Sequence, residues 1–334
     1  MTQGESANGR LVTVFGGSGF LGRHVTRALA KRGWRVRAAV RRPDLAFHLQ
    51  PLGGVGQVTA FQANLRYPDS VEAALRGADA AVNLVGVLTP RGRQTYDAVQ
   101  SYGAQTVAEA VKAAGLTRFA HVSAIGADMQ SPSAYGRSKA EGEAHVRAAT
   151  PGAVIFRPSF VFGPEDEFFN RFATLARLSP VMPVAGAQTR AQPVFVGDVA
   201  EAIARAIEGR AEAGKTYELG GPDVMTMRDV VEFVLKTIGR KRPIMELPEA
   251  GARFMGTVTN FADIVSLGLM PKEFVTTPDQ MAMLGADNLV SDEARREGRT
   301  LEGLGITPSV AAAIAPTYLY RFRKTGQFER AEQN

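Results

Sequence analysis

Short apolar runs alternate with helical patterns along the first half of this chain. Strand-like runs are expected at residues 11–15, 35–40, 58–62, 80–84, 119–123 and 153–157. Most of the segments between them have helical spacing, at 20–32, 71–76, 95–115 and 135–149. Strands that alternate with helices pair in parallel and are buried on both faces, so they are apolar throughout. The pattern therefore predicts an α/β protein with a doubly wound parallel sheet.

The alternation weakens after about residue 160. Helical patterns are expected at 169–177, 198–208 and 227–238, the last opened by Thr226, with one strand-like run at 216–218. We expect a flexible tail at 1–10 and a sheet domain over 11–165, to which the chain returns around 190–222. Residues 166–334 are expected to form mainly a smaller C-terminal α+β lobe for substrate or partner contact, over the carboxyl edge of the sheet.

A glycine-rich run follows the first expected strand directly. It reads Gly16, Gly17, Ser18, Gly19, Phe20, Leu21 and Gly22. In such a run the first glycine permits the tight turn, the next lets backbone N–H groups approach a diphosphate, and the last lets the helix pack close to the sheet. The positive end of the following helix then faces the phosphates. The strand before the run and the helix after it predict a dinucleotide-binding Rossmann site.

The end of the second expected strand indicates which dinucleotide binds. An NAD site normally has Asp or Glu there, on the ribose 2′-hydroxyl, whereas this chain has Arg41 and Arg42. A planar guanidinium suits a 2′-phosphate and stacks on adenine. These residues favour NADPH (NADP) over NAD as the cofactor, although a solvated basic turn would have the same composition.

The composition excludes several kinds of site. The 334 residues include no cysteine, which excludes disulfides, thiolate zinc sites, iron–sulfur ligation and cysteine nucleophiles. The four histidines lack metal-ligand spacing, so no metal is expected. The formal net charge of +6 permits an anionic partner without choosing one. No signal peptide or transmembrane helix is expected, which predicts a cytoplasm-like compartment.

Taken together, these features resemble the short-chain dehydrogenase/reductase superfamily in its extended or atypical form. The other motifs that carry the resemblance are Asn64-Leu65, Asn83–Gly86, His121–Ala124, Tyr135–Lys139, Arg157–Ser159, Phe162–Pro164, Pro193–Ala200 and Leu219–Pro222. The resemblance implies adenine contacts near Asn64 and Leu65, where the superfamily often has Asp in place of Asn64. It implies a cofactor ribose near the backbone of Val85 and Gly86. The residues that it places beside the nicotinamide are Pro158, Ser159 and Phe162.

Tyr135 and Lys139 lie four residues apart, on one face of an expected helix. A nearby ammonium favours the phenolate, so Tyr135 could exchange a proton with a substrate oxygen near neutral pH. The resemblance implies that Lys139 also binds the nicotinamide ribose and that Ser123 holds the substrate oxygen. The three residues match the superfamily's catalytic triad. They could equally be vestigial, because the same lysine and tyrosine can hold a cofactor without turnover.

One position departs from the superfamily pattern. The long helix at 95–115 usually contains an Asn within a VN-x-x-G pattern, and this chain has Gln100 there. Gln is longer and need not support the same backbone or water relay. The sequence therefore indicates cofactor binding more firmly than efficient catalysis.

The later segments narrow the resemblance. The run FGPEDEFFNRF at 162–172 is unusual for sugar epimerases and resembles the NADPH-binding accessory subunits of respiratory complex I, the 39-kDa type. The resemblance covers about residues 10–325. It implies a tightly held, structural NADPH and docking beside the core subunits near the quinone site. It further implies a peripheral position on the cytoplasmic side of the bacterial inner membrane. Nucleic acid is not an expected partner, because no recognised binding motif accompanies the basic residues.

Two C-terminal patterns leave alternatives open. An apolar helical stripe is expected at Phe254, Val258, Phe261 and Val265, within 254–270, either facing the core or facing a partner or membrane surface. Aromatic and basic residues interleave at 318–324, as at a protein interface, at a lipid headgroup layer or on a terminal helix with a solvated basic face. Either pattern allows contact with membrane surface lipids.

The sequence therefore leaves two main functions open. The first is an NADP(H)-binding accessory subunit of complex I with a structural cofactor. The second is an active NAD(P)H-dependent reductase or epimerase that acts on a small carbonyl or a nucleotide sugar. A regulatory NADP(H) sensor is a third interpretation.

Overall fold

The computed structural model describes residues 9–248, 251, 257, 277–324 and 326–328. The chain divides into two compact units. The first comprises the chain up to Pro158 together with Val196–Leu219 and Ser291–Thr307. The second comprises Ser159–Phe195, Gly220–Val290 and the chain from Pro308. The return of Ser291–Thr307 to the first unit was not indicated by any sequence pattern.

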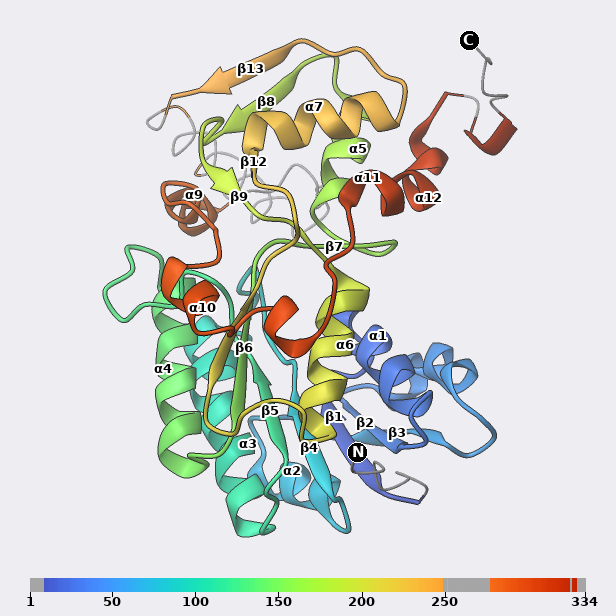
Figure 1. Ribbon diagram of the computed structural model, residues 1–334, viewed down its shortest axis with the longest axis vertical. Coiled ribbons are helices and arrows are strands. Elements are labelled where there is room, and N and C mark those ends of the chain that lie inside the picture. The colour runs from blue at the N-terminus through green and yellow to red at the C-terminus, as the bar shows by residue number, and fades with distance from the viewer. Residues whose placement is uncertain (1–8, 249–250, 252–256, 258–276, 325, 329–334) are drawn as a thin grey trace. The chain divides into compact units, whose positions relative to one another are not determined.

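A seven-stranded sheet forms the centre of the first unit (Figure 1). Its strands are β1 (Leu11–Phe15), β2 (Arg35–Val40), β3 (Val58–Gln62), β4 (Ala80–Asn83), β5 (Phe119–Val122), β6 (Val154–Pro158) and β11 (Thr216–Leu219). The order is β3-β2-β1-β4-β5-β6-β11, and every neighbouring pair is parallel. The predicted doubly wound sheet is confirmed. The order reverses between β1 and β4, and ligands bind outside the carboxyl ends of strands at such a point.

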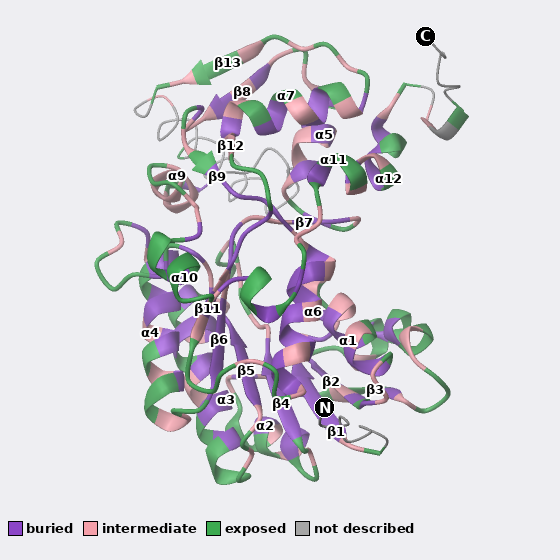
Figure 2. Ribbon diagram, in the orientation of Figure 1, coloured by how far each residue is buried: buried purple, intermediate pink, exposed green. Residues whose placement is uncertain are grey.

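Helices cover both faces of this sheet (Figure 1). On one face α1 (Phe20–Ala30) packs against α6 (Val196–Ile207), and on the other α2 (Pro68–Leu75), α3 (Tyr102–Ala113) and α4 (Ala134–Ala149) pack in sequence. The strand β1 is buried along its whole length, as the apolar run predicted. Figure 2 shows this buried layer continuing through the neighbouring strands. The short helix α10 (Asp292–Arg296) completes the described α-helices of this unit.

Two helices differ from the pattern read in the sequence. The expected helix at 95–115 is a π-helical turn, η3 (Asp97–Ser101), that leads into α3. The expected helix at 71–76 begins earlier, at Pro68, because proline fits the first turn of a helix, where its missing N–H has no partner to lose.

The second unit contains helices and short paired strands. In the described part of this unit, three two-stranded sheets pair β7 (Val161–Phe162) with β10 (Val194–Phe195), β9 (Arg190–Ala191) with β12 (Met225–Thr226), and β8 (Met182–Ala185) with β13 (Ile244–Leu247). The described α-helices are α5 (Phe169–Leu178), α7 (Met227–Thr237), α9 (Pro278–Met283), α11 (Ala311–Ile314) and α12 (Pro316–Leu319). The start of α7 is confirmed, since Thr226 and Asp229 form a capping box there.

The C-terminal patterns have different outcomes. The stripe at Phe254, Val258, Phe261 and Val265 lies outside the described residues. In the aromatic and basic run, Tyr318 and Phe322 are buried in the core of the second unit. Its basic residues Arg321 and Lys324 are exposed. None of the helices in the described ranges is long and apolar enough to cross a bilayer.

Candidate nucleotide-binding site

The glycine turn joins the carboxyl end of β1 to the start of α1. Gly16 has φ +79°, a left-handed conformation that glycine adopts without strain. The Gly16 N–H donates to the Ala39 carbonyl of β2 (3.0 Å), and the Gly19 N–H donates to the Gly16 carbonyl (3.0 Å). A Cβ atom on Gly22 would lie 2.2 Å from the Gly16 carbonyl oxygen. Glycine at position 22 therefore lets the first turn of α1 sit directly against the loop.

The N-terminus of α1 is open to an anion. Gly19 is its N-cap residue, and no side chain in the described residues caps this end. The first turn carries no acidic residue. Unpaired N–H groups and the positive end of the helix dipole together favour a bound phosphate. The turn and this helix end thus fit the diphosphate of a dinucleotide.

The two arginines that follow β2 differ in whether their guanidinium groups are already paired. Arg42 is bound to Asp44 through two nitrogens, with Nη2 2.6 Å and Nε 3.2 Å from Oδ2. Arg41 is exposed and makes no hydrogen bond or ion pair with any described residue. The guanidinium of Arg41 is therefore available to a 2′-phosphate, whereas Arg42 would first have to exchange the Asp44 carboxylate.

The residues expected near the adenine and the ribose lie after β3 and β4. The Asn64 side-chain oxygen accepts from the Arg66 N–H (3.2 Å), so this amide braces its own loop, and Leu65 is buried. Val85 donates its N–H to the Asn83 side chain (3.1 Å). Gly86 is exposed, and a Cβ atom there would lie 3.3 Å from the Nζ of Lys139.

Lys139 is buried on α4 beside the carboxyl end of β5. Its Nζ donates to the Val122 carbonyl (3.1 Å) and lies next to Gly86. Burial lowers the pKa of Lys139 to about 8, against an opposing effect of the Glu143 carboxylate. The fold therefore brings Lys139 together with Gly86, the two residues that the family resemblance predicts beside the cofactor ribose.

Tyr135 lies one turn earlier on α4 and packs edge-on against Tyr96, with ring centroids 5.8 Å apart. The Lys139 Nζ is 5.9 Å from the centroid of the Tyr135 ring. Burial raises the pKa of Tyr135 to about 12. The sequence-based prediction of a lowered pKa is wrong for this state, because desolvation of the phenolate outweighs the ammonium. Tyr135 is therefore a neutral phenol near pH 7.

Ser123 follows β5, and its N–H donates to the Phe156 carbonyl (2.7 Å). Its hydroxyl is buried and has no hydrogen-bond partner among the described residues. A buried hydroxyl without a partner costs free energy, which a ligand oxygen or a water molecule could offset. The hydroxyl therefore suits the role of holding a polar ligand atom.

Glu143 is a further charged residue of this layer that sequence reasoning missed. Its carboxylate is 1% exposed and accepts from Arg157 (2.8 and 2.9 Å) and Arg147 (2.9 Å). Burial opposes ionisation, but hydrogen bonds and charge from Arg157 outweigh it and hold the pKa of Glu143 below its usual range. The nearby Ser123 hydroxyl also lowers the pKa of Glu143, although the two groups do not form a hydrogen bond of ordinary geometry. The sequence did offer a signal for Glu143, because it lies four residues after Lys139 and therefore on the same face of the helix.

Gln100 lies in the π-helical turn and is 2% exposed. Its amide donates to the Val87 carbonyl (2.6 Å) and accepts from the Ser138 hydroxyl (3.3 Å). Through these two hydrogen bonds Gln100 ties the loop after β4 to α4, the helix that carries Tyr135 and Lys139. Single π-helical turns such as this one often occur at functional sites.

Three more expected residues lie at or beyond the end of β6. Pro158 is its last residue and belongs to the first unit. Ser159 and Phe162 belong to the second unit, where the Ser159 hydroxyl donates to Asn288. Phe162 is fully buried and stacks on Phe169, with ring centroids 5.1 Å apart. Within its own unit Phe162 is thus a core residue.

His121 gives this region a predicted pH dependence. It accepts at Nδ1 from the Asn83 amide (3.2 Å), and burial lowers its pKa from 6.5 to about 3. The unfolded chain therefore binds more protons between these values, and the free energy of unfolding should fall as the pH drops from 6.5 toward 3.

The replacement His121→Asn keeps an acceptor for Asn83 and removes the titration. In urea titrations, the stability difference between pH 6.5 and pH 4.5 should shrink by about 2–3 kcal/mol. An unchanged difference would contradict this assignment.

Comparison with known proteins identifies the class. A family profile described as NAD(P)H-binding matches residues 16–161, which include the glycine turn and Lys139. The NADPH-dependent quinone oxidoreductase of Escherichia coli, complexed with NADPH, superposes with a TM-score of 0.67 at 21% identity, over 92% of this chain and 99% of that one. Triphenylmethane reductase of Citrobacter sp. gives 0.70 at 17% identity, over 92% and 99%. The fold and the glycine turn are those of an NAD(P)H-binding Rossmann protein.

Sequence relatives narrow this class. Mitochondrial NADH dehydrogenase (ubiquinone) 1 alpha subcomplex subunit 9 of Arabidopsis thaliana is 33% identical, over 96% of this chain and 80% of its own. The mitochondrial NADH-ubiquinone oxidoreductase 40 kDa subunit of Neurospora crassa is 31% identical, over 97% and 83%. The chain belongs to the family of these complex I subunits. Ceramide reductase of Caulobacter vibrioides is a further relative, 32% identical over 77% and 82%.

Proposed function

We propose that this chain is an accessory subunit of respiratory complex I that holds NADPH as a structural group and does not turn it over. The observation that carries the proposal is the 33% identity to a complex I subunit over 96% of the chain. The extent of the match includes both units, so it supports a shared role beyond a shared nucleotide-binding fold.

The geometry of the site supports a cofactor that stabilises the protein. The glycine turn and Lys139 belong to one unit and present donors to a dinucleotide. A ligand that binds only the folded state at a hundred times its dissociation constant stabilises that state by about 2.7 kcal/mol. Burial raises the pKa of Tyr135 to about 12, so the phenol keeps its proton near pH 7 when no substrate is present. Binding without turnover is consistent with both features.

NADPH is proposed over NADH because of the residues after β2. Position 41 is a free arginine where an NAD site would have an acidic residue. Asp44 is engaged by Arg42 and is not free to accept from a ribose hydroxyl. The 2′-phosphate of NADPH would pair with the Arg41 guanidinium.

The proposed partners are the core subunits of complex I near the quinone site. In a bacterium, this places the chain on the cytoplasmic side of the inner membrane, attached through the complex and through contact with surface lipids. Nucleic acid is not a proposed partner.

Affinity purification from detergent-solubilised membranes tests this proposal. The tagged chain should recover complex I core subunits, and the nucleotide extracted from it should be NADPH. The Arg41→Ala variant should retain less NADPH, by about tenfold or more in affinity, because a charge-assisted contact is lost. Tyr135→Phe should recover the same subunits and the same nucleotide as the unaltered chain.

Two results would overturn the proposal. A chain that purifies alone, without complex I subunits, would remove the assembly role. Loss of assembly in Tyr135→Phe, with the nucleotide retained, would mean that the phenol acts in more than packing.

An active reductase is the second candidate, favoured by the ceramide reductase relative and by the presence of Ser123, Tyr135 and Lys139. In this case Lys139 would hold the ribose, Ser123 would hold the substrate oxygen, and Tyr135 would supply a proton to the carbonyl. NADPH oxidation with a lipid or small carbonyl substrate, abolished by Tyr135→Phe, would favour it. No substrate-dependent oxidation would exclude it.

A further inference from the structure

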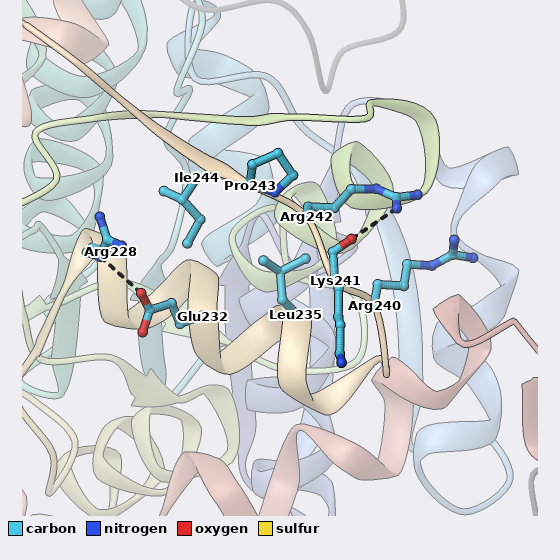
Figure 3. Close-up of a pocket in the computed structure, with 8 residues that line it drawn as sticks. All are labelled: Arg228, Glu232, Leu235, Arg240, Lys241, Arg242, Pro243 and Ile244. Carbon is cyan, nitrogen blue, oxygen red and sulfur yellow. Dashed lines mark hydrogen bonds and ion pairs between the residues drawn. The ribbon is translucent and has the colours of Figure 1, made fainter.

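A shallow, open hollow of about 540 Å³ lies in the second unit at the end of α7, and none of the residues that line it belongs to the nucleotide site (Figure 3). Figure 3 shows Leu235 and Ile244 between two charged groups, with Arg228 and Glu232 on one side and the consecutive cations Arg240, Lys241 and Arg242 on the other. All of these residues belong to the second unit. Neither the family assignment nor the proposed function gives this hollow a role.

The end of α7 explains why three cations gather here. Gly239 has φ +62°, and the Arg240 N–H donates back to the Leu235 carbonyl (3.0 Å). This is a Schellman turn, in which a left-handed glycine ends the helix and redirects the chain. The chain then runs through Arg240, Lys241 and Arg242 into β13, which pairs with β8. The turn thus places a basic tripeptide along the rim of the hollow.

The charges of the hollow are not balanced within the described chain. Arg228 is neutralised, because it binds Glu232 (2.9 Å) and Glu246 (2.6 Å). The Lys241 ammonium is exposed and has no hydrogen bond or ion pair with a described residue, whereas the Lys241 carbonyl accepts from Nη1 of Arg242 (3.1 Å). Arg240 and Arg242 likewise have no carboxylate partner in the described ranges. The rim therefore carries a net positive charge that an anion would offset.

The two arginines are held in place by backbone carbonyls. Nε of Arg242 donates to the carbonyls of Ala176 (3.1 Å) and Ser179 (2.9 Å). Nε of Arg240 donates to the Phe322 carbonyl (3.0 Å). These bonds fix each guanidinium while leaving terminal N–H groups without a carboxylate. Donors fixed in advance bind an anion at a lower cost in side-chain entropy than mobile ones.

The floor of the hollow is apolar. Leu235 is buried, and Ile244 is partly exposed beside it. A bare inorganic anion would gain nothing from this floor, whereas an ester with a hydrocarbon part would bury apolar surface on it. The combination fits a phosphate group attached to an aliphatic portion.

We propose that this hollow is a phosphate-ester site, in which the Arg240–Arg242 rim binds the phosphate and the Leu235–Ile244 floor contacts the attached carbon chain. The phosphate could belong to the headgroup of an anionic phospholipid or to a soluble ester. Both present the same chemistry to the rim. The inference does not depend on the proposed function.

Binding measurements on the full chain test this site with two probes. Glycerol 3-phosphate represents the soluble ester, and vesicles of phosphatidylglycerol in phosphatidylcholine represent the lipid, with pure phosphatidylcholine vesicles as the reference. The chain should bind at least one probe, and Lys241→Gln should weaken that binding about fivefold, the effect of one cation near an anionic surface. Vesicle binding without ester binding assigns the lipid, and the reverse assigns the soluble ester.

Lys236→Gln is the matched control. Lys236 is an exposed lysine on α7 outside the lining of the hollow, so the substitution changes the net charge equally. It should leave binding nearly unchanged, and Lys241→Arg should retain it. Equal weakening by Lys236→Gln and Lys241→Gln would overturn the proposal in favour of diffuse attraction. Absence of binding to both probes would also overturn it.

Discussion

The substitution Gly22→Ala should release the bound nucleotide and lower the free energy of unfolding by about 2–4 kcal/mol. The added Cβ would lie 2.2 Å from the Gly16 carbonyl oxygen and 2.7 Å from the Gly17 carbonyl carbon. Both neighbours are backbone atoms of the turn, so no side chain can move aside. The N-terminus of α1 must then shift away from the loop, and the N–H groups that would bind the diphosphate lose their alignment. Nucleotide content after purification and urea unfolding with added NADPH measure the two effects.

Gly152→Ala is the control for this prediction. A Cβ atom at Gly152 would have no atom within 4 Å, so the same change should alter stability by less than about 0.5 kcal/mol and leave the nucleotide bound. Full retention of nucleotide by Gly22→Ala at unaltered stability would mean that the turn does not hold the diphosphate. The nucleotide-binding assignment would then fail for both candidate functions.

The second large effect is expected at Asp166, inside the run at 162–172 that carries the resemblance to complex I subunits. Its carboxylate is 4% exposed and accepts from the N–H groups of Gly163, Phe168 and Asn170 (2.9 Å each) and from the Tyr318 hydroxyl (2.8 Å). Burial raises the pKa of Asp166, against the effect of these donors. Burial raises the pKa of Tyr318 above its ordinary range, and the charge of the Asp166 carboxylate and the hydrogen bond to it raise it further. This one side chain therefore joins the start of α5 to α12.

Asp166→Ala should lower the stability of the second unit by about 3–5 kcal/mol, because four donors, three of them buried, lose their acceptor. Asp166→Asn should have a smaller effect, since it keeps one acceptor oxygen. Urea unfolding measures the loss, and limited trypsin digestion should cut faster at Arg321, whose side chain contacts Asn170 near Asp166. Asp223→Ala removes an exposed carboxylate from the same unit and should change neither readout. Wild-type stability in Asp166→Ala would contradict the assigned role.

The same run shows why a sequence motif and its physical role can be far apart. The sequence marks residues 162–172 as distinctive without saying what they do. The structure shows that Phe162 and Phe169 fill the core of the second unit and that Asp166 anchors a helix near the C-terminus. The partner of Asp166 is Tyr318, 152 positions away, and local patterns do not report such a contact.

The elements of the first unit could be predicted because their signals are local. The expected runs at 11–15, 35–40 and 58–62 match β1, β2 and β3 at both ends. Apolar alternation, glycine turns and helix caps act over a few residues, so a single sequence reveals them. The paired strands β7, β9, β10 and β12 were missed, because two residues are too few to show a period.

The amino-acid sequence by itself determined the parallel sheet, the glycine turn at its first strand and the pair of arginines after its second. It also determined the common helix of Tyr135 and Lys139. Only the tertiary structure decided the electrostatic state of these residues. Burial raises the pKa of Tyr135 and lowers that of Lys139, and the Arg157 guanidinium keeps Glu143 ionised beside them. The physical reason is that desolvation and charge depend on which distant segments cover a side chain, whereas helix and strand formation depend on its near neighbours along the chain.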